Sequence, residues 1–536
     1  MTFSVVDMKN FVIMDSSLSL GGAETFNARF IKYLSKDSSN RVILLTVPGG
    51  TVRSLLEDND IDVEVFYIHD AWTFNVSPRS RDMLHELGRE IRGVLNGKVF
   101  VLCCYIENLH KAMYIFDGQS DVYLLSGVLH PEAWSLWHPD SGFDASHSFG
   151  PRQVDELWHY KRRLLKELDS HKALWYPNDI YRRYNEYYFD IEMKHQASAT
   201  VPVELPEARF KYQPMIFSNV LRIVWLGRFD FFKNASIRAF IEEIREVIKD
   251  SSICVQIDLI GYGEARYEQE LRELSGPKEI DLNFIGKLSE AEIQILLCKN
   301  QYHFGFGMGS SAYHLAAIGL PVLAIDSAVK GYEKWVKACW LCDASDEFDE
   351  GSSLYLDLIG EASGNRQQLP EIIQDIISDV DSLHDIGERC QSYVKEYHDV
   401  DKIMGKISGF MMNSNFNKKI VYEPNDIIDD SFFYLVSPNV SEVTIAVFGT
   451  GAASLGWCNL VDSHNDRNPN KIKIAYFFDN NRAKHGSYLD GKLISPVSVE
   501  LCNSVDVIVL ASEYWYQMQK QILDIGVARN KIFRAL

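Results

Sequence analysis

Residues 221–234 read LRIVWLGRFDFFKN, and this stretch decides the fold class. The short apolar run LRIVWL is typical of a strand, and a glycine and two cations follow it directly. In open α/β sheets, ligands bind just beyond the carboxyl ends of the strands, which is where these polar residues stand. The segment therefore predicts a strand that leads into a binding loop.

The same alternation of short apolar runs with amphipathic stretches continues in both directions from this segment. Downstream it includes ICVQIDLIGYG (253–263), LNFIGKL (282–288) and GLPVLAI (319–325). Upstream, candidate strands cover residues 11–14, 41–47, 63–68, 99–104 and 122–125. A further series with three candidate strands follows a polar linker. Such alternation is typical of βα units stacked around parallel sheets.

We therefore predict an α/β protein made of three Rossmann-like domains. The predicted parts are an N-terminal domain (1–205), a second domain (206–412), a linker (413–440) and a third domain (441–536). Residues 338–343, which hold the CWLC pair Cys339 and Cys342, are expected to form an apolar strand and not half of a zinc site, because no second pair follows.

Composition narrows the function. The chain has 536 residues and a formal net charge of −20, which argues against an extended nucleic-acid interface, since such interfaces depend on Lys and Arg. Residues 1–15 carry acids among apolar residues, unlike a secretory signal. The nine cysteines form no disulfide framework. A cytoplasmic location is expected, without nucleic acid as a partner.

The loop after residues 221–226 suits a diphosphate. Gly227, Arg228, Lys233 and Asn234 lie on it, and a guanidinium and an ammonium both oppose the charge of a departing diphosphate. Taken alone, the same residues could also be ordinary surface charges on a βα loop. The surrounding motifs are needed to distinguish a diphosphate site from such a loop.

The order of these motifs resembles the C-terminal half of GT-B glycosyltransferases, specifically the large retaining family four. The pattern GR-x4-KN is followed by LIGYGE (259–264), NFIGKLSEAEI (283–293) and FGMGSSAYHLAAIGLPVLA (306–324). Upstream, SLSLGGAETFNARFIKYL (17–34) is similar to the family's glycine-rich loop and first helix. The resemblance covers roughly residues 8–400 and implies two facing Rossmann-like domains that use a nucleotide sugar.

The resemblance also implies roles for individual residues. Arg228 and Lys233 would hold the donor diphosphate, and His130 would lie at the reacting sugar. These three are the predicted catalytic residues. The predicted donor-binding residues are Gly21, Gly22, Glu24, Gly227, Asn234, Lys287, Leu288, Ser310, Ser311 and His314. Glycines let the backbone approach a phosphate, and a helix N-terminus offers free N–H groups.

The sequence departs from the family at two positions. The family has two glutamates eight positions apart, and Phe306 and His314 occupy those places here. His314 could still contact the donor ribose, but Phe306 cannot accept a hydrogen bond from a sugar. A retaining reaction is expected. An inverting reaction would need a base from the N-terminal domain, for which the candidates are His130, Glu24, Glu107 and Glu132.

No metal is expected at the site. The string Asp58-Asn59-Asp60 matches the metal motif of a rival transferase architecture, but it falls in a polar turn without the surrounding nucleotide-binding pattern. No cofactor is required if Arg228, Lys233 and backbone N–H groups neutralise the diphosphate.

The third domain has its own candidate nucleotide site. In TIAVFGTGAASLG (444–456), Gly449, Gly451 and Gly456 follow a strand, and Asp479 ends the next one. A glycine turn and an acid at those places can hold a phosphate and a ribose. The run from FFDNN to ILDIGV resembles the small Rossmann domain of bacterial proteins that modify nucleotide sugars. A bound nucleotide, a docking role and an independent reaction all stay open.

The leading functional prediction is transfer of a sugar to a saccharide acceptor in bacterial surface polysaccharide synthesis, such as O-antigen or capsule. A lipid-linked acceptor would bring the protein to the inner face of the membrane, and polysaccharide-assembly proteins are candidate partners. The basic segment 155–168 fits a solvated helix face better than a membrane surface. The alternatives are a catalytically reduced protein that only binds sugar nucleotide, and a bifunctional enzyme whose last domain modifies the sugar.

Overall fold

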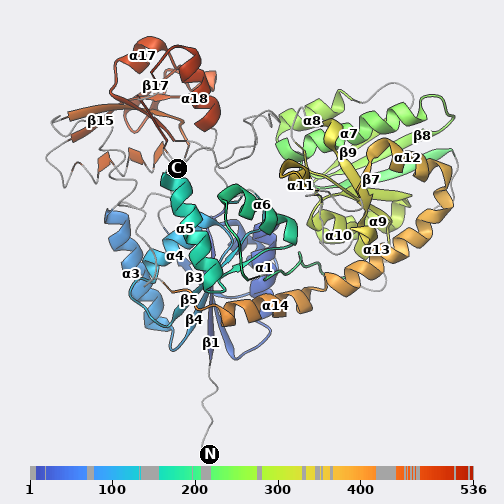
Figure 1. Ribbon diagram of the computed structural model, residues 1–536, viewed down its shortest axis with the longest axis horizontal. Helices are drawn as coiled ribbons and strands as arrows, with labels where there is room; N and C mark the ends of the chain where they lie inside the picture. The colour runs from blue at the N-terminus through green and yellow to red at the C-terminus, as the bar shows by residue number, and fades with distance from the viewer. Residues whose placement is uncertain are drawn as a thin grey trace, which may run out of the picture.

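The structure is a computed structural model. It describes residues 8–18, 20–68, 78–131, 133–134, 156–195, 197–206, 219–274, 280–328, 333–344, 351, 354–361, 366–417, 442–451, 454–455, 457–458, 461–462, 465, 471–511, 515–528 and 531–534. These residues form three separate sheets, each with helices around it (Figure 1). No helix among them is long and apolar enough to cross a membrane.

The first sheet has the strand order β3-β2-β1-β4-β5-β6, and all its pairs are parallel. Its elements are β1 (Lys9–Asp15), α1 (Gly22–Leu34), β2 (Asn40–Thr46), α2 (Thr51–Glu57), β3 (Glu64–Tyr67), α3 (Pro78–Val94), β4 (Val99–Cys103), α4 (Ile106–Ile115), β5 (Val122–Gly127), α5 (Glu156–Ser170), β6 (Leu174–Trp175) and α6 (Asp179–Phe189). The five predicted strands are confirmed to within about two residues, and four of them are largely buried, whereas the edge strand β3 is only partly buried.

The second sheet has the order β13-β12-β11-β10-β7-β8-β9. Near one edge, β12 runs antiparallel to both of its neighbours, β11 and β13. Its elements are β7 (Val220–Leu226), α7 (Phe231–Ile248), β8 (Cys254–Ile260), α8 (Ala265–Arg272), β9 (Ile280–Gly286), α9 (Glu290–Asn300), β10 (Phe304–Gly307), α10 (Ser310–Ala317), β11 (Val322–Ile325), β12 (Lys337–Trp340), α11 (Leu354–Leu358), β13 (Gln367–Gln368), α12 (Leu369–Ser378) and α13 (Leu383–Tyr397). The opening segment 221–226 lies within β7, as predicted.

The strand predicted at 338–343 is too long. β12 ends at Trp340, and Leu341–Asp343 form a turn of 3-10 helix. Cys339 is buried and acts as a small apolar residue. Cys342 is only partly buried and lies in the turn beyond the strand.

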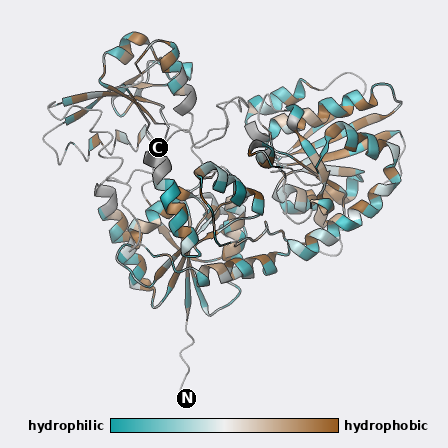
Figure 2. Cartoon of the chain, viewed as in Figure 1, coloured by the Kyte–Doolittle hydropathy of each residue, from teal (hydrophilic) through white to brown (hydrophobic). Residues whose placement is uncertain are grey.

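The third sheet has the order β16-β17-β15-β14-β18-β19 and is parallel except for the β16–β17 hairpin. Its described elements are β14 (Glu442–Phe448), β15 (Lys471–Phe478), β16 (Tyr488–Leu489), β17 (Lys492–Ser495), α17 (Val499–Asn503), β18 (Val507–Leu510), α18 (Trp515–Asp524) and β19 (Ile532–Arg534). Figure 2 shows the apolar strands of all three units covered by helices whose outer faces are hydrophilic.

The chain does not leave the second unit where the sequence suggested. A long helix, α14 (Val400–Asn413), runs back beneath the first unit (Figure 1). Its apolar face packs against β5, β4 and α1, and Met404 and Ile407 are fully buried there. Ser414 Oγ then donates to the Leu124 carbonyl at 2.6 Å. The predicted boundary at 412/413 therefore cuts through a segment that completes the first unit.

Candidate functional site

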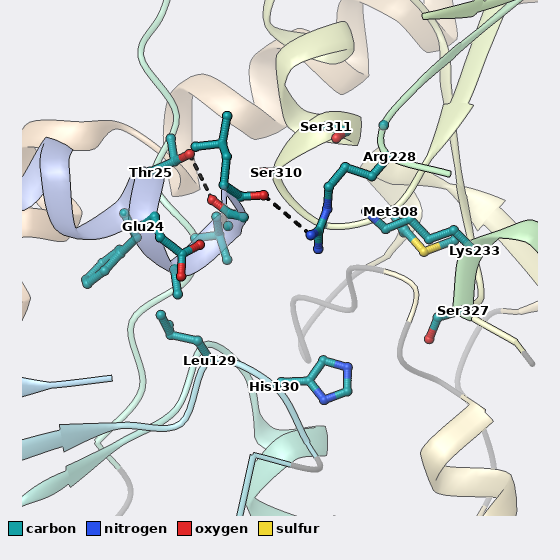
Figure 3. A pocket seen from close by; sticks show the side chains of 18 of the residues that line it. Glu24, Thr25, Leu129, His130, Arg228, Lys233, Met308, Ser310, Ser311 and Ser327 are labelled. Carbon is teal, nitrogen blue, oxygen red and sulfur yellow. Dashed lines mark hydrogen bonds between the residues drawn. The ribbon is translucent and has the colours of Figure 1, made fainter. Parts of the chain in front are cut away.

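A cavity of about 560 Å³ lies between the carboxyl ends of the first two sheets. Its walls come from the loops after β1, β4 and β5 on one side and from those after β7, β8, β9 and β10 on the other. Figure 3 shows side chains of both units pointing into this space. The carboxyl ends of parallel strands are where such sheets bind ligands.

The first wall is the glycine loop that links β1 to α1. A Cβ atom on Gly21 would lie 2.7 Å from a Glu24 carboxylate oxygen and 3.8 Å from Arg228 Nη2, so a side chain there would enter the gap between the two units. Glu24 is buried and accepts a 2.5 Å hydrogen bond from the Tyr105 hydroxyl. The loop thus keeps open a narrow space that faces Arg228.

The opposite wall carries two cations. Arg228 follows β7, and its guanidinium donates to the Leu20 carbonyl at 3.4 Å, across the cleft, and lies 3.7 Å from the Asp230 carboxylate. Lys233 lies in the first turn of α7. Burial lowers the pKa of Lys233, and the charge of Arg228 lowers it further, while Asp230 raises it. Such a partly desolvated cation gains most from an incoming anion.

His130 lies at the end of β5, directly across the cavity from Lys233. Burial, followed by the charge of Lys233, lowers the pKa of His130 to about 4. The imidazole is therefore neutral at pH 7. A neutral ring offers one N–H donor and one acceptor nitrogen to a bound sugar or phosphate.

The remaining wall lies in the second unit. Gly309 precedes α10, and Ser310 and Ser311 of its first turn line the cavity. Lys287 and Leu288, after β9, line it as well, and the Lys287 ammonium lies 5.1 Å from the centre of the Tyr262 ring. Eleven of the thirteen predicted catalytic and donor-binding residues are therefore brought to one cavity: Gly21, Gly22, Glu24, His130, Gly227, Arg228, Lys233, Lys287, Leu288, Ser310 and Ser311.

Asn234 and His314 are the exceptions. The Asn234 amide is buried and donates to the Tyr267 carbonyl and to Glu270, both at 3.2 Å, so it fastens α7 to α8 and does not line the cavity. His314 lines a neighbouring pocket of about 180 Å³, where its Nε2 lies 3.0 Å from the Arg29 guanidinium. The side chains of both residues have found partners outside the cavity.

Neither Phe306 nor Glu107 is among the described residues that line the cavity. Phe306 is fully buried and stacks on Phe240 with ring centroids 4.0 Å apart. Glu107 lies on α4 outside the cavity lining. Glu132 lies outside the described residues.

Sequence reasoning missed several lining residues. Tyr105 and Tyr262 follow β4 and β8 directly, so the rule that selected Arg228 after β7 would also have selected them. Met308, Ser327 and Tyr355 also line the cavity. Tyr355 carries no such signal, because it stands on a helix far from the predicted strand ends.

The candidate site of the third unit is partly occupied by its own side chains. Asp479, at the end of β15, accepts from Thr450 Oγ1, from Lys484 Nζ at 3.0 Å and from the Asn481 backbone N–H at 2.8 Å. Gly449 and Gly451 lie on the loop after β14, and Gly456 lies outside the described residues. A ribose at Asp479 would have to displace Lys484.

Asp15, behind the glycine loop, gives a pH-dependent prediction. It is fully buried and accepts from the Ser17 backbone N–H at 2.9 Å and from Asn27 Nδ2 at 2.7 Å. Burial, followed by the charge of Glu24, raises the pKa of Asp15 from 3.8 to about 6. A raised pKa in the folded state means that the protonated form stabilises the fold, and this contribution is lost as pH rises through 6.

We therefore expect the free energy of unfolding of Asp15→Asn, measured relative to wild type, to increase by about 3 kcal/mol as the pH rises from 4 to 7. Asparagine stays neutral at every pH, so the free energy of unfolding of the variant does not change with pH through this position. Urea unfolding of both proteins at several pH values measures the difference. Parallel stability curves over that range would contradict a buried, titrating Asp15.

Comparisons with known proteins bear on the fold. A family model described as "C2185-like, N-terminal" matches residues 441–533. No curated protein is significantly similar to the sequence. Among solved structures, a glycosyltransferase from Rickettsia africae ESF-5 is similar with a TM-score of 0.51 and 11% identity, over 76% of this chain and 99% of that one.

Two further structures are similar over the same part of the chain. HepE from Anabaena, solved with UDP and glucose, has a TM-score of 0.48 and 13% identity, over 75% of this chain and 99% of that one. The lipopolysaccharide outer core galactosyltransferase WaaB has a TM-score of 0.47 and 12% identity, over 76% of this chain and 99% of that one. Together with the two facing sheets, the likeness to the Rickettsia protein shows that this chain has the GT-B fold, followed by a third α/β unit.

Proposed function

We propose that the protein is a glycosyltransferase that moves a sugar from a nucleotide sugar to a saccharide acceptor in the cavity between its first two units. One observation carries the proposal: a single cavity joins Arg228 and Lys233 of the second unit to the glycine loop and His130 of the first. Two cations can hold a diphosphate and stabilise its charge as it leaves, a glycine loop lets the backbone approach it, and a neutral imidazole can bond to the sugar.

The diphosphate is proposed to lie between Arg228 and the glycine loop, with Lys233 toward the sugar. The bond between the sugar C1 and the diphosphate oxygen breaks, and the acceptor hydroxyl oxygen bonds to C1. The nucleoside diphosphate leaves. Arg228 and Lys233 stabilise the charge that grows on the leaving group, which is the step where fixed cations contribute most.

The fate of the acceptor proton decides the stereochemistry. In the retaining reaction that we propose, this proton passes to the departing diphosphate oxygen on the same face of the sugar. The inverting alternative needs a base in the first unit. Glu24 is the acidic residue among the described residues that line the cavity, and its carboxylate accepts from Tyr105, so its position is already defined.

A donor screen tests the proposal. We expect the protein to hydrolyse one of a panel of nucleotide sugars slowly, and to do so in EDTA, because Arg228, Lys233 and backbone N–H groups neutralise the diphosphate. Release of nucleoside diphosphate is measured over time. Loss of turnover in EDTA, with recovery on adding manganese or magnesium, would instead favour a metal-dependent reaction.

A second candidate function is binding of sugar nucleotide without turnover. The residues at the family's two glutamate positions favour this candidate. Phe306 is buried in the core, and His314 is held by Arg29. An arginine can only donate, so Nε2 of His314 accepts and its proton lies on Nδ1, 3.6 Å from a Glu290 oxygen. Tight donor binding with no hydrolysis in the screen would support this candidate.

The setting that we propose is assembly of a bacterial surface polysaccharide such as O-antigen or capsule, in the cytoplasm or at the inner face of the membrane. Polysaccharide-assembly proteins are the proposed partners. The third unit is proposed to bind a nucleotide after Lys484 moves away from Asp479. Should it modify the sugar instead, purified protein would carry NAD or S-adenosylmethionine.

A further inference from the structure

A segment of the second unit crosses to the first. After β12 the chain reaches Gly351 and then α11, and we call residues 351 and 354–361 the strap. Tyr355 and Leu356 of the strap are buried in the hydrophobic core of the first unit, and Ile359 packs against it. The helix of the strap packs on α6 of that unit. The strap thus spans the cleft, although its neighbours in sequence belong to the second sheet.

Polar contacts hold the strap on both sides. The Lys337 ammonium of β12 donates to Asp357 at 2.8 Å, which ties the strap to the second unit. Glu361 forms an ion pair with Arg183 of α6, in the first unit. Gly351 has a φ of +102°, and a Cβ there would lie 2.3 Å from the Ile325 carbonyl oxygen, so the entry to the strap requires glycine.

The strap closes one end of the cavity, which we call the sugar end. The Tyr355 ring lies against His130 at 6.2 Å between centroids, with the planes 87° apart, and against Tyr184 at 5.0 Å. Gly351 approaches Met308 and accepts from the Ser327 backbone N–H at 2.8 Å. Figure 3 shows His130, Lys233, Met308 and Ser327 around this end of the space.

Among the described residues, few side chains at the sugar end bind hydroxyls. Its described side chains include Leu129, Pro131, Met308 and the ring of Tyr355, and its polar groups include those of His130, Lys233 and Ser327 and the Tyr355 hydroxyl. Glu24, the acid among the described lining residues, accepts from the Tyr105 hydroxyl through Oε1. A site of this kind leaves several hydroxyls of an ordinary hexose without partners, whereas an apolar group on the sugar finds apolar contacts.

We propose that Tyr355 of the strap is a specificity-determining residue and that the donor sugar carries a methyl group against it. This inference rests on the proposed function. The methyl group is either C6 of a 6-deoxyhexose or the acetyl group of an N-acetylhexosamine, and both present the same chemistry to the apolar wall. Tyr355 also holds the His130 ring edge-on, so one side chain sets both the wall and the imidazole.

The test begins with nucleoside diphosphates. UDP, dTDP, GDP and ADP are titrated against the full-length protein by calorimetry, and the base that binds is used for every donor. The parent hexose, its 6-deoxy form and its 2-acetamido form are then compared by hydrolysis. We expect one methyl-bearing donor to have a kcat/KM about tenfold above that of the parent hexose.

The variants assign this preference to the strap. Tyr355→Leu keeps an apolar side chain but removes the ring, and we expect it to lose the preference while its affinity for the nucleoside diphosphate is unchanged. Tyr355→Phe should retain the preference. Tyr187→Leu, on the exposed side of α6, is the matched control and should behave as wild type. Thermal melting checks folding, and Met308→Gln replaces Tyr355→Leu if that variant unfolds.

The outcomes separate the two proposals. If none of the four diphosphates binds, the proposed function is wrong. If one binds but the parent hexose is used as well as its methyl-bearing analogues, this inference alone is overturned. It is also overturned if the preference survives in Tyr355→Leu, or in Met308→Gln when that variant is the one tested.

Discussion

Replacing Arg228 or Lys233 by alanine is expected to lower kcat/KM for sugar transfer by about 100- to 1,000-fold, which corresponds to about 3 to 4 kcal/mol of lost transition-state stabilisation. Both cations line the cavity, and Arg228 reaches across it to the Leu20 carbonyl. Their charge counts most when the diphosphate leaves, because negative charge then grows beside two cations that the fold already holds in place. The loss should therefore fall mainly on kcat.

The matched control is Arg238→Ala. Arg238 stands on α7, the same helix as Lys233, but does not line the cavity, and it lies 3.7 Å from Glu242 at the surface. Its loss should leave turnover near wild type. Steady-state kinetics with the best donor, together with melting temperatures, separate a catalytic defect from unfolding. Near-normal turnover in Arg228→Ala or Lys233→Ala would remove that residue from the proposed site.

The second large effect concerns the end of the GT-B part. A chain that ends after Asn417 is expected to fold and bind nucleoside diphosphate, whereas a chain that ends after Asp399 is expected not to fold. The longer of these two chains contains α14 and residues 414–417, and the shorter one lacks them. Met404, Ile407, Met411 and Phe416 are at most 1% exposed against the first unit. Burying four such side chains contributes about 6 to 12 kcal/mol, which equals much of the stability of a typical domain.

Circular dichroism melting and calorimetric titration of the two truncated chains measure this effect, with the full-length protein as reference. Equal melting temperatures for both would mean that α14 does not complete the first unit. If the chain ending at Asn417 loses nucleotide binding, the third unit belongs to the catalytic part, and our three-part division fails. The comparison thus tests the division and the packing of α14 separately.

Local sequence patterns predicted the strands, and together with the family resemblance they named eleven of the residues that line the cavity. A strand buried on both faces leaves a short apolar run, and the residues just after it must reach the sheet edge where ligands bind. Arg228 was selected in this way, whereas His130 and Lys287 were assigned from the family resemblance. The same rule applies to Tyr105 and Tyr262, which were overlooked because no motif pointed to them.

Asn234 and His314 show the limit of motif transfer. A motif assigns a position on an element, but it does not say which neighbour the side chain meets. Asn234 faces α8, and His314 meets Arg29, a residue 285 positions away on α1 of the other unit. Such partners depend on how two separately encoded units come together, and no window of sequence contains both.

The α/β class, the three series of βα units and the position of the two cations and the glycine loop after predicted strands follow from local sequence patterns, because each depends on periodicity within a few dozen residues. The resemblance implied that these strand ends face each other. Only the tertiary structure decided that α14 completes the first unit and that the strap places Tyr355 against His130. Those contacts join residues more than 200 positions apart. These contacts are stabilised by the burial of apolar surface. In the sequence, the helices that provide this surface look like any other amphipathic helix.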